Sequence, residues 1–226
     1  VFEDGVATPQ PGQKALLAVH PHGILALGYT FMANSLEFFN SEIRWLVASS
    51  LFYFPFFADM LGWGNTYSAS KESLLGFMKR GENIGLLPGG FQEATLHLHD
   101  NYRVYIKNRK GFIKYAMQYG YKIHPVFVFG EDKTYHTVHM MDSFRLWLNQ
   151  FQIPGVIFSS RLGILPEPLI DVTAVVGPAL ELPSSASPTP QEVDEQHALY
   201  VVALEKLFND HKAAYAAHPD AELVVM

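Results

Sequence analysis

The sequence predicts an α/β fold with a mixed, largely buried sheet flanked by helices. Three apolar runs, at residues 15–19, 83–87 and 123–129, each end in a turn that contains proline or glycine, as buried strands do. Segments with helical spacing of apolar residues separate these runs, and this alternation favours strands covered by helices. Hydrophobic residues make up 49% of the 226 positions, enough for a sizeable core. Because no repeat and no clear boundary interrupts the pattern, we expect residues 1–226 to form a single domain.

The remaining elements follow from capping and periodicity. Ser70 caps a helix that runs to Arg80, where Gly81 ends it, and Gly120 ends the helix that starts near Lys110. The other predicted strands are residues 44–49, 65–68 and 172–176. The other predicted helices are residues 24–36, 143–151 and 191–217, with a short one after Tyr53 that ends near Gly62. The predicted buried face of the last helix is Val193, Leu199, Val202, Leu207 and Phe208.

Composition and missing motifs exclude several classes of protein. The net charge of −6 argues against nucleic acid as a partner. The absence of cysteine excludes disulfides, thiolate metal sites and an acyl-cysteine intermediate. The sequence has no Gly-x-Ser-x-Gly elbow, no Walker A motif and no Gly-x-Gly-x-x-Gly, which argues against a serine hydrolase and a nucleotide-binding protein.

Two apolar segments suit either a protein core or a lipid interface. The first, residues 45–58, is 14 residues long and therefore shorter than the roughly 20 residues of a membrane-spanning helix. The second, residues 143–151, is amphipathic and carries Trp147. Because the chain begins with valine, we also expect it to be a fragment or a processed chain whose upstream membrane segments are missing.

The centre of the predicted site is the sequence His20-Pro21-His22-Gly23, which follows the first buried strand. Functional groups of α/β sheets collect at the carboxyl ends of the strands. Histidine has an unperturbed pKa of about 6.5, which suits a general base. The alternative is a histidine with a purely structural role. Two imidazoles in a turn after a buried strand favour the catalytic interpretation.

The second motif is Pro88-Gly89-Gly90, which closes the second buried strand and is followed by Glu93. Backbone N–H groups of Gly89 and Gly90 are candidates to stabilise developing negative charge. A carboxylate such as Glu93 is what a catalytic imidazole needs to fix its tautomer and to stabilise its charged form. The alternative is an ordinary tight turn with a solvated glutamate.

A third group of residues is basic. Five positive charges fall within residues 103–114, and Arg109, Lys110 and Gly111 open a predicted helix whose N-terminus suits a phosphate group. A solvated basic face is an equal alternative. Paired histidines also make a metal site conceivable, but no zinc-binding signature supports one. These pairs are His20 and His22, His97 and His99, and His136 and His139.

Taken in order, these blocks resemble the type 2 diacylglycerol acyltransferase family, which includes monoacylglycerol acyltransferases and wax-ester synthases. The matching blocks are His20 to Gly23, Tyr53-Phe54-Pro55, Pro88 to Glu93, Arg109 to Glu131, Val176 to Pro178, and a tail from Val193 to Tyr215. The resemblance covers nearly the whole chain. One departure is His124, which stands where the family more often has an apolar residue.

The resemblance implies a glycerolipid-acyltransferase-like fold that moves a fatty acyl group from acyl-coenzyme A, as co-substrate and without a cofactor, to a neutral lipid alcohol. Diacylglycerol is the expected acceptor; monoacylglycerol and long-chain alcohol are the alternatives. The resemblance places the protein at the cytosolic face of the endoplasmic reticulum membrane or at a lipid droplet, and family members carry an N-terminal membrane hairpin. The sequence leaves open whether the protein is an oligomer. A lipid-binding relative without catalysis and a thioester hydrolase remain open.

The resemblance also suggests roles for individual residues. His22 is the general base, Glu93 orients it, and His20 helps Gly89 and Gly90 to stabilise the oxyanion. The basic residues, Arg109 and Lys110 with Gly111 among them, hold the coenzyme A phosphates, and the aromatic segment with Tyr53, Phe54 and Pro55 lines an acyl groove. Related phosphate-using acyltransferases have an aspartate five residues after the histidine, where this chain has Leu27, and an arginine near the proline-glycine turn. The missing cation indicates an uncharged acceptor.

Overall fold

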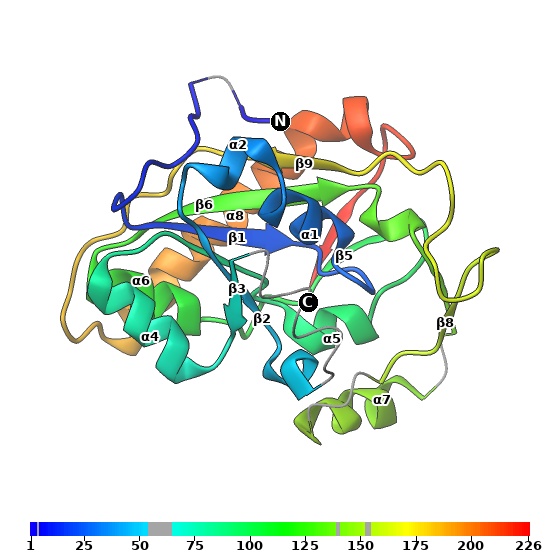
Figure 1. Cartoon of the computed structure of the whole chain (residues 1–226), viewed down its shortest axis with the longest axis horizontal. Helices are drawn as coiled ribbons and strands as arrows, with labels where there is room; N and C mark the ends of the chain where they lie inside the picture. The colour runs from blue at the N-terminus through cyan, green and yellow to red at the C-terminus, as the bar shows by residue number, and fades with distance from the viewer. Residues whose placement is uncertain (4, 54–64, 139–140, 152–154) are drawn as a thin grey trace.

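A six-stranded sheet forms the centre of the computed structural model, which describes residues 1–226 apart from 4, 54–64, 139–140 and 152–154 (Figure 1). The strand order is β3-β2-β4-β1-β6-β9. Its strands are β1 (Ala15–His20), β2 (Arg44–Val47), β3 (Thr66–Ser68), β4 (Ile84–Leu86), β6 (Lys122–Phe129) and β9 (Thr173–Val176). Neighbouring strands run parallel except for β9, which is antiparallel to β6. The predicted mixed α/β sheet is therefore confirmed.

Strand β1 lies inside the sheet, and all six of its residues are buried. Leu16 is paired with Ile84 of β4 and with Ile123 of β6. Because these strands are parallel and in register, their carboxyl ends meet at one edge of the sheet. That edge brings together the turns after His20, after β4 and after β6, which contain the motifs found in the sequence.

Helices cover both faces of the sheet, as Figure 1 shows. They are α1 (Leu27–Ala33), α2 (Leu36–Phe39), α4 (Lys71–Arg80), α5 (Gly90–Thr95), α6 (Gly111–Tyr119), α7 (Asp142–Leu148) and α8 (Pro190–Tyr215). One core cluster joins the sheet to α4, α6 and α8, and the other joins it to α1 and α2. Leu16 and Ala18 of β1 belong to the first cluster and Leu17 and Val19 to the second, as expected for alternating strand residues.

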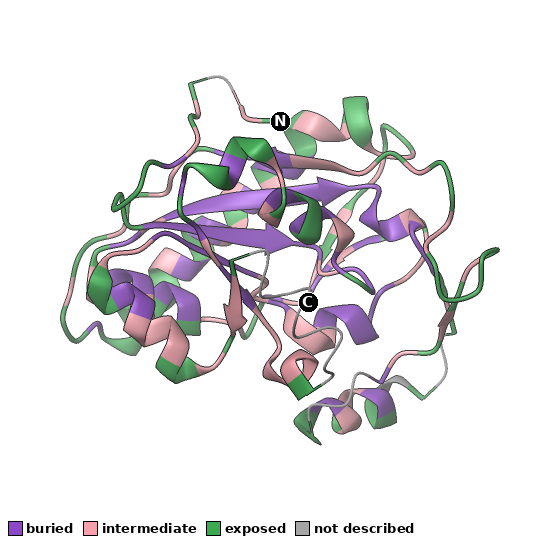
Figure 2. Cartoon of the chain, in the orientation of Figure 1, coloured by how far each residue is buried: buried purple, intermediate pink, exposed green. Residues whose placement is uncertain are grey.

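Short elements complete the chain. The described residues include the 3₁₀-helices η1 (Ser49–Tyr53), η2 (Glu131–Lys133) and η3 (Asn149–Phe151). They also include small sheets that pair β5 (Tyr102–Val104) with β10 (Leu223–Val225) and β7 (His136–Thr137) with β8 (Phe158–Ser159). Figure 2 shows the buried residues concentrated in the sheet and on the helix faces that contact it. Among the described residues, no helix combines the length and apolar character needed to cross a bilayer.

Capping signals predicted both ends of α4 and the end of α6, whereas the cap of α8 was not predicted. The Ser70 side chain accepts a hydrogen bond from the Ser73 N–H at 3.2 Å, and Gly81 ends α4 with a φ of +73°. Gly120 ends α6 with a φ of +67°. The Thr189 hydroxyl and the Glu192 carboxylate form a reciprocal capping box at the start of α8. The short helix predicted to end near Gly62 lies outside the described residues.

Three helix predictions need correction. The segment 24–36 is not one helix: Gly23 and Ala26 have positive φ, so α1 begins only at Leu27, and the chain turns after Asn34 before α2. The 143–151 segment is α-helical only to Leu148 and then becomes η3. The third correction concerns which face of α8 is buried.

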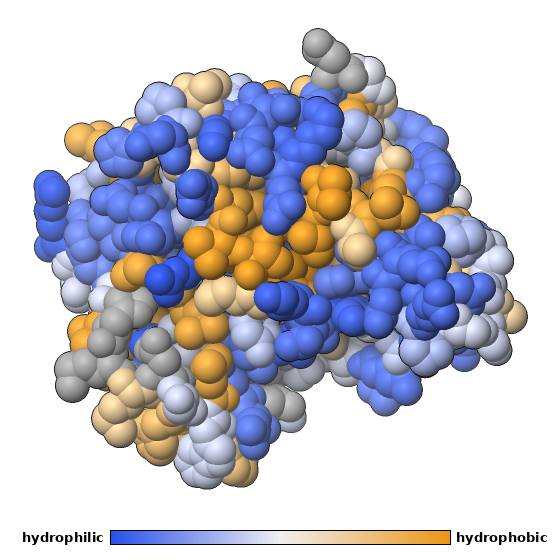
Figure 3. Space-filling model, turned by 180° about the vertical axis from the view of Figure 1, so that it is seen from behind, coloured by the Kyte–Doolittle hydropathy of each residue, from blue (hydrophilic) through white to orange (hydrophobic). Residues whose placement is uncertain are grey.

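The buried face of α8 differs in part from the prediction. Val193, Leu207 and Phe208 are buried as expected, but Leu199 is 52% and Val202 is 61% exposed. His197 and Tyr200 are buried in their place, because each side chain has a backbone carbonyl oxygen as hydrogen-bond partner inside the protein. Figure 3 views the whole molecule from behind. An apolar area lies in the middle of that side of the molecule, next to hydrophilic residues.

Candidate active site

His20 and Glu93 face each other inside the protein. His20, at the end of β1, has 0% exposure, and its Nδ1 lies 3.4 Å from Oε1 of Glu93. Glu93 is 3% exposed, so it is not the solvated glutamate of the alternative interpretation. His20 Nε2 and Glu93 Oε2 are both buried and have no hydrogen-bond partner among the described residues. The sequence predicted that Glu93 contacts His22, whereas the side-chain contact of the structure is with His20.

The Pro-Gly-Gly turn makes room for the Glu93 carboxylate. A Cβ built on Gly89 would lie 1.4 Å from Oε2 of Glu93, so only glycine fits at that position. Gly90 has a φ of +55° and starts α5, which places Glu93 in the first helical turn. The Gly90 N–H donates to the Leu87 carbonyl at 3.2 Å. Gly90 therefore uses its N–H within the turn, and Gly89 remains the backbone candidate for stabilising an oxyanion.

His22 is partly buried in the turn that follows β1. Its Nδ1 lies 2.9 Å from the Gly23 carbonyl oxygen. Because a carbonyl oxygen only accepts, Nδ1 carries a hydrogen, and in the neutral ring the lone pair is on Nε2. Burial lowers the pKa of His22, while the Gly23 carbonyl and the negative charge of Glu93 partly offset that shift. The ring is thus held as a neutral base at neutral pH.

Glu131 supports the same turn from the end of β6. It is 1% exposed, and its carboxylate accepts hydrogen bonds from the backbone N–H groups of Leu27 at 3.1 Å and Gly28 at 2.9 Å. Burial raises the pKa of Glu131 to about 7, and the two backbone donors partly offset the shift. Sequence analysis did not single out this residue. The available signal was its position directly after the third buried strand, at the same edge as the histidines.

Tyr200 of α8 approaches the buried histidine from the opposite face of the sheet to α1. Its ring centroid lies 6.3 Å from that of His20, and its hydroxyl donates to the Ala18 carbonyl at 3.4 Å. Burial raises the pKa of Tyr200 well above its usual value, and the nearby Glu93 charge raises it further. The hydroxyl therefore stays protonated.

The basic residues do not form a cluster of five free cations. Lys110, the N-cap of α6, forms an ion pair with Asp194 of α8 at 2.8 Å. The Arg109 guanidinium lies 5.7 Å from the centroid of the Tyr105 ring. The Nε atoms of Arg103 and Arg109 are buried without a partner in the described part of the chain. A phosphate at the start of α6 would compete with Asp194 for Lys110.

Other predicted positions lie away from these contacts. Tyr53, at the end of η1, is 81% exposed, and Phe54 and Pro55 lie outside the described residues. His99 stacks on His136 with ring centroids 3.9 Å apart. Within the described ranges, no three histidine, cysteine or carboxylate side chains are grouped in a way that could hold a metal ion.

Comparisons with known proteins find relatives over most of the chain. The sequence profile described as "Diacylglycerol acyltransferase" matches residues 7–226. The chain is 31% identical to "2-acylglycerol O-acyltransferase 1" of Mus musculus over 95% of this chain and 70% of that protein. It is 31% identical to "Acyl-CoA wax alcohol acyltransferase 1" of Mus musculus over 96% and 72%. It is also 31% identical to "Diacylglycerol O-acyltransferase 2" of Dictyostelium discoideum over 91% and 68%.

No solved structure matches this chain. The profile match and these relatives show that the chain belongs to the diacylglycerol acyltransferase family. The protein is therefore an acyltransferase, and the predicted class of enzyme is confirmed.

Proposed function

We propose that this protein transfers a fatty acyl group from acyl-coenzyme A to the hydroxyl of diacylglycerol and so produces triacylglycerol. The observation that carries the chemistry is the 2.9 Å contact between His22 Nδ1 and the Gly23 carbonyl. This contact leaves Nε2 as the basic atom of a ring whose pKa is lowered by burial. A neutral imidazole in such a position is suited to accept a proton from an alcohol.

The proposed reaction is a direct transfer. His22 Nε2 accepts the hydroxyl proton as the alcohol oxygen attacks the thioester carbonyl carbon. The tetrahedral intermediate then breaks its carbon–sulfur bond and releases the coenzyme A thiolate, which takes the proton from His22. We assign stabilisation of the oxyanion to the Gly89 N–H, because the Gly90 N–H is bonded within the turn.

In this mechanism Glu93 acts on two histidines in different ways. Its carboxylate contacts His20 directly at 3.4 Å. Its negative charge also favours the imidazolium form of His22, the form that exists after proton transfer. We therefore propose that Glu93 and His20 form a buried pair that supports His22. This pair replaces the direct contact between Glu93 and His22 that the sequence predicted.

Two features support a neutral lipid as acceptor. The relatives are named for 2-acylglycerol, wax alcohol and diacylglycerol, each of which presents a hydroxyl on an apolar body. The segment after the Pro-Gly-Gly turn is Phe91-Gln92-Glu93 and has no cation to pair with a phosphate. Diacylglycerol is the choice among the three because the family profile carries that name.

For the location we propose the cytosolic face of the endoplasmic reticulum membrane or the surface of a lipid droplet, because the acceptor dissolves there. Three aromatic side chains of α7 and η3 support contact with lipid. Phe144, Trp147 and Phe151 are 49%, 48% and 58% exposed, and their rings contact one another. Aromatic side chains in such positions suit the interface between water and lipid.

The test is lipid analysis in a host that lacks its own neutral-lipid synthesis. The chain is expressed behind a membrane hairpin as wild type and as His22→Ala, and both proteins are checked for folding and membrane binding. Triacylglycerol that forms only with the wild type supports the proposal. Wax ester or diacylglycerol as the product would change the acceptor, and free fatty acid would indicate hydrolysis. No product from either protein would favour a lipid-binding relative without catalysis.

A further inference from the structure

The segment formed by α7 and η3 buries polar side chains and exposes aromatic ones. Arg145 and Asn149 are 5% and 7% exposed. Phe144, Trp147 and Phe151 are each about half exposed. A surface helix of a soluble protein normally shows the reverse pattern, with its apolar residues inside. The observed pattern suits a helix whose inner face binds polar groups of the protein and whose outer face contacts lipid.

The two buried polar side chains bind the end of α5, which lies next to α7 in Figure 1. Arg145 donates from Nη2 to the Thr95 carbonyl at 2.7 Å and from Nε to the Gly155 carbonyl at 2.5 Å. Asn149 donates from Nδ2 to the Thr95 hydroxyl at 3.0 Å, and its Oδ1 accepts from the Gly155 N–H at 3.3 Å. Thr95 is the last residue of α5 and is fully buried. We call these hydrogen bonds the α5–α7 network.

The network acts on the end of α5 that needs donors. The last carbonyl groups of a helix have no partner within the helix, and the helix dipole favours a cation there. Arg145 supplies both the hydrogen bond and the positive charge to the Thr95 carbonyl. The network therefore fixes where α5 ends.

Glu93 belongs to the same short helix, two residues before Thr95. Helix α5 has six residues, Gly90–Thr95, which make about 1.7 turns. A helix this short moves as one piece, so a displacement of Thr95 also displaces Glu93. The Glu93 carboxylate lies 3.4 Å from Nδ1 of His20, and a small shift of α5 would change this contact.

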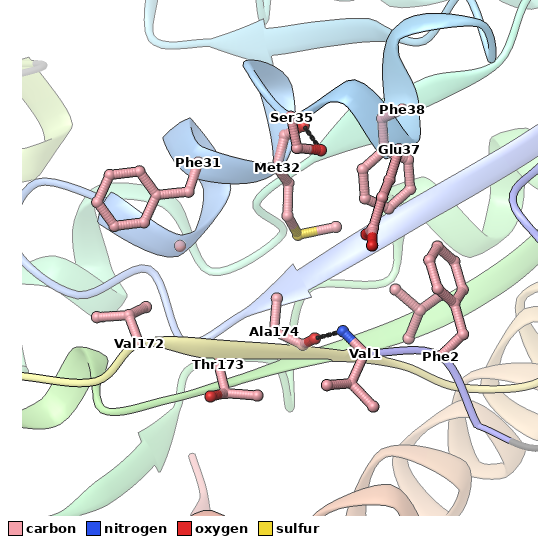
Figure 4. Close-up of a pocket in the computed structure, with 12 residues that line it drawn as sticks. Val1, Phe2, Phe31, Met32, Ser35, Glu37, Phe38, Val172, Thr173 and Ala174 are labelled. Atoms are coloured by element: carbon pink, nitrogen blue, oxygen red, sulfur yellow. Dashed lines mark hydrogen bonds between the residues drawn. The ribbon is translucent and has the colours of Figure 1, made fainter.

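A groove elsewhere on the molecule does not reach the candidate active site. It has a volume of about 300 Å³ and lies between α1, α2 and β9, with Phe31 and Met32 facing Val172 (Figure 4). In the described part of the chain, its lining includes neither histidine of the His-Pro-His-Gly motif, nor Glu93. The contact between α7 and α5, in contrast, leads from an exposed aromatic surface directly to the helix that carries Glu93.

We infer that Arg145 and Asn149 are positioning residues, which hold α5, and through it Glu93, in the arrangement that acyl transfer needs. The inference rests on the proposed function, because that function gives Glu93 its role beside His22. It also relates that function to lipid. The helix that presents exposed aromatic side chains to a lipid surface is the helix that fixes the position of Glu93.

The first test measures the coupling between Glu93 and His22 without requiring turnover. The full chain is labelled on its histidines and titrated by NMR in dodecylphosphocholine micelles, with His22→Ala to identify the signal. In the wild type, Glu93→Gln should lower the pKa of His22, because the Glu93 charge raises it. In the Thr95→Val and Arg145→Gln backgrounds, the same change should have at most half that effect. The charge of Arg145 cancels within each pair of proteins.

Kinetics and lipid binding give the second test. Thr95→Val and Arg145→Gln should each lower kcat at least tenfold and change the KM for acyl-coenzyme A less than twofold, since small displacements of catalytic groups are costly. Arg145→Lys keeps a cation at the end of α5 and should recover part of the lost kcat. Binding to phosphatidylcholine vesicles should stay as in the wild type, because the exposed aromatic side chains remain. Thr95→Val keeps the test decisive if Arg145→Gln does not fold.

The matched control is Tyr135→Phe. It removes the hydrogen bond from the Tyr135 hydroxyl to the Ile164 carbonyl at 3.1 Å, which involves neither α5 nor α7. Thermal unfolding compares its stability with that of the network variants. We expect Tyr135→Phe to keep the coupling between Glu93 and His22 and the kcat of the wild type.

The outcomes separate this inference from the proposed function. Acyl transfer with full coupling and unchanged kcat in both network variants would overturn the inference and leave the function intact. Lower kcat with full coupling would also overturn it, because the network would then only support the fold. The same holds if Glu93→Gln leaves the pKa of His22 unchanged in the wild type. If the wild type transfers no acyl group, the proposed function fails, and the titration still decides whether the network positions Glu93.

Discussion

Gly23 lies directly against the carboxylate of Glu131. A Cβ built on Gly23 would come within 2.2 Å of Oε1 of Glu131, and Gly23 itself has a φ of +61°. The same glycine offers its carbonyl oxygen to Nδ1 of His22 at 2.9 Å. One small residue thus connects the buried carboxylate after β6 to the proposed base after β1. The orientation of His22 depends on this contact.

The first prediction concerns Gly23→Ala. The new methyl group would collide with Glu131 and displace the turn, so we expect acyl transfer to fall at least a hundredfold, since small misplacements of a catalytic group are costly. The matched control is Gly12→Ala, because Gly12 has a φ of +77° and nothing within 4 Å of a built Cβ. It carries only the backbone strain of roughly 1–2 kcal/mol. Equal activity losses in the two variants would show that the collision does not matter.

The sequence predicted that its motifs would lie at the carboxyl ends of buried strands, and it could do so because its signals are local. Each buried strand is marked by an apolar run, and each run ends in a turn with proline or glycine, so the meeting of His20, Gly89 and Glu131 at one edge follows from parallel pairing. The helix ends at Gly81 and Gly120 follow from the backbone freedom of glycine. These features require no knowledge of distant contacts.

The pairing of side chains could not be predicted in the same way. Whether Glu93 contacts His20 or His22 depends on the path of the turn through Pro21, which places one ring inside the protein and the other near the surface. The ion pair between Lys110 and Asp194 joins residues 84 positions apart, and nothing in the sequence relates them. Such contacts depend on how α6 and α8 pack together.

The second prediction concerns the pH dependence of stability. The pKa of Glu131 is about 7 in the folded protein, compared with an ordinary value of 4.5, so the folded state binds more protons than the unfolded state between these values. The contribution of Glu131 to stability is therefore fully present below pH 4.5 and is lost as the pH rises to about 7. The loss is about 3 kcal/mol.

Glu131→Gln should remove this dependence. We expect the free energy of unfolding of the wild type to fall relative to that of the variant between pH 5 and pH 7.5, measured by urea unfolding at each pH. Asp132, whose pKa is raised to about 6 by burial, contributes in the same direction but is present in both proteins. A constant difference between wild type and variant across this range would contradict the raised pKa of Glu131.

The third prediction separates the two histidines. Glu93→Gln keeps the shape of the side chain but removes the charge that supports the imidazolium form, so we expect the rate of transfer to fall about a hundredfold or more. Because Glu93 contacts His20 and its charge also acts on His22, the double variant His20→Ala/Glu93→Gln should be slower than His20→Ala alone, but by a smaller factor than Glu93→Gln slows the wild type. Thermal unfolding checks that each variant folds. Effects that multiply would show that Glu93 acts independently of His20.

The fourth prediction tests the basic residues at α6. If Lys110 binds a coenzyme A phosphate, Lys110→Ala should raise the KM for acyl-coenzyme A severalfold with little change in kcat. Asp194→Asn should lower that KM, because it frees Lys110 from its ion pair. Lys206→Ala is the matched control, since Lys206 also pairs with an exposed carboxylate. The two lysine variants should each change stability by less than about 1 kcal/mol. An unchanged KM in Lys110→Ala would remove this residue from donor binding.

The fifth prediction concerns the aromatic side chains of α7. Because Phe144 and Trp147 are about half exposed and stack at 5.6 Å, they are placed to enter a lipid surface together. Burial of such side chains contributes about 1.5–3 kcal/mol each when complete. Phe144→Ser/Trp147→Ser should therefore reduce binding to phosphatidylcholine vesicles tenfold or more in a flotation assay. Leu199→Ser/Val202→Ser removes a similar apolar pair from α8 and should bind as the wild type does. The reverse result, with only the α8 variant impaired, would place the lipid-facing surface at α8.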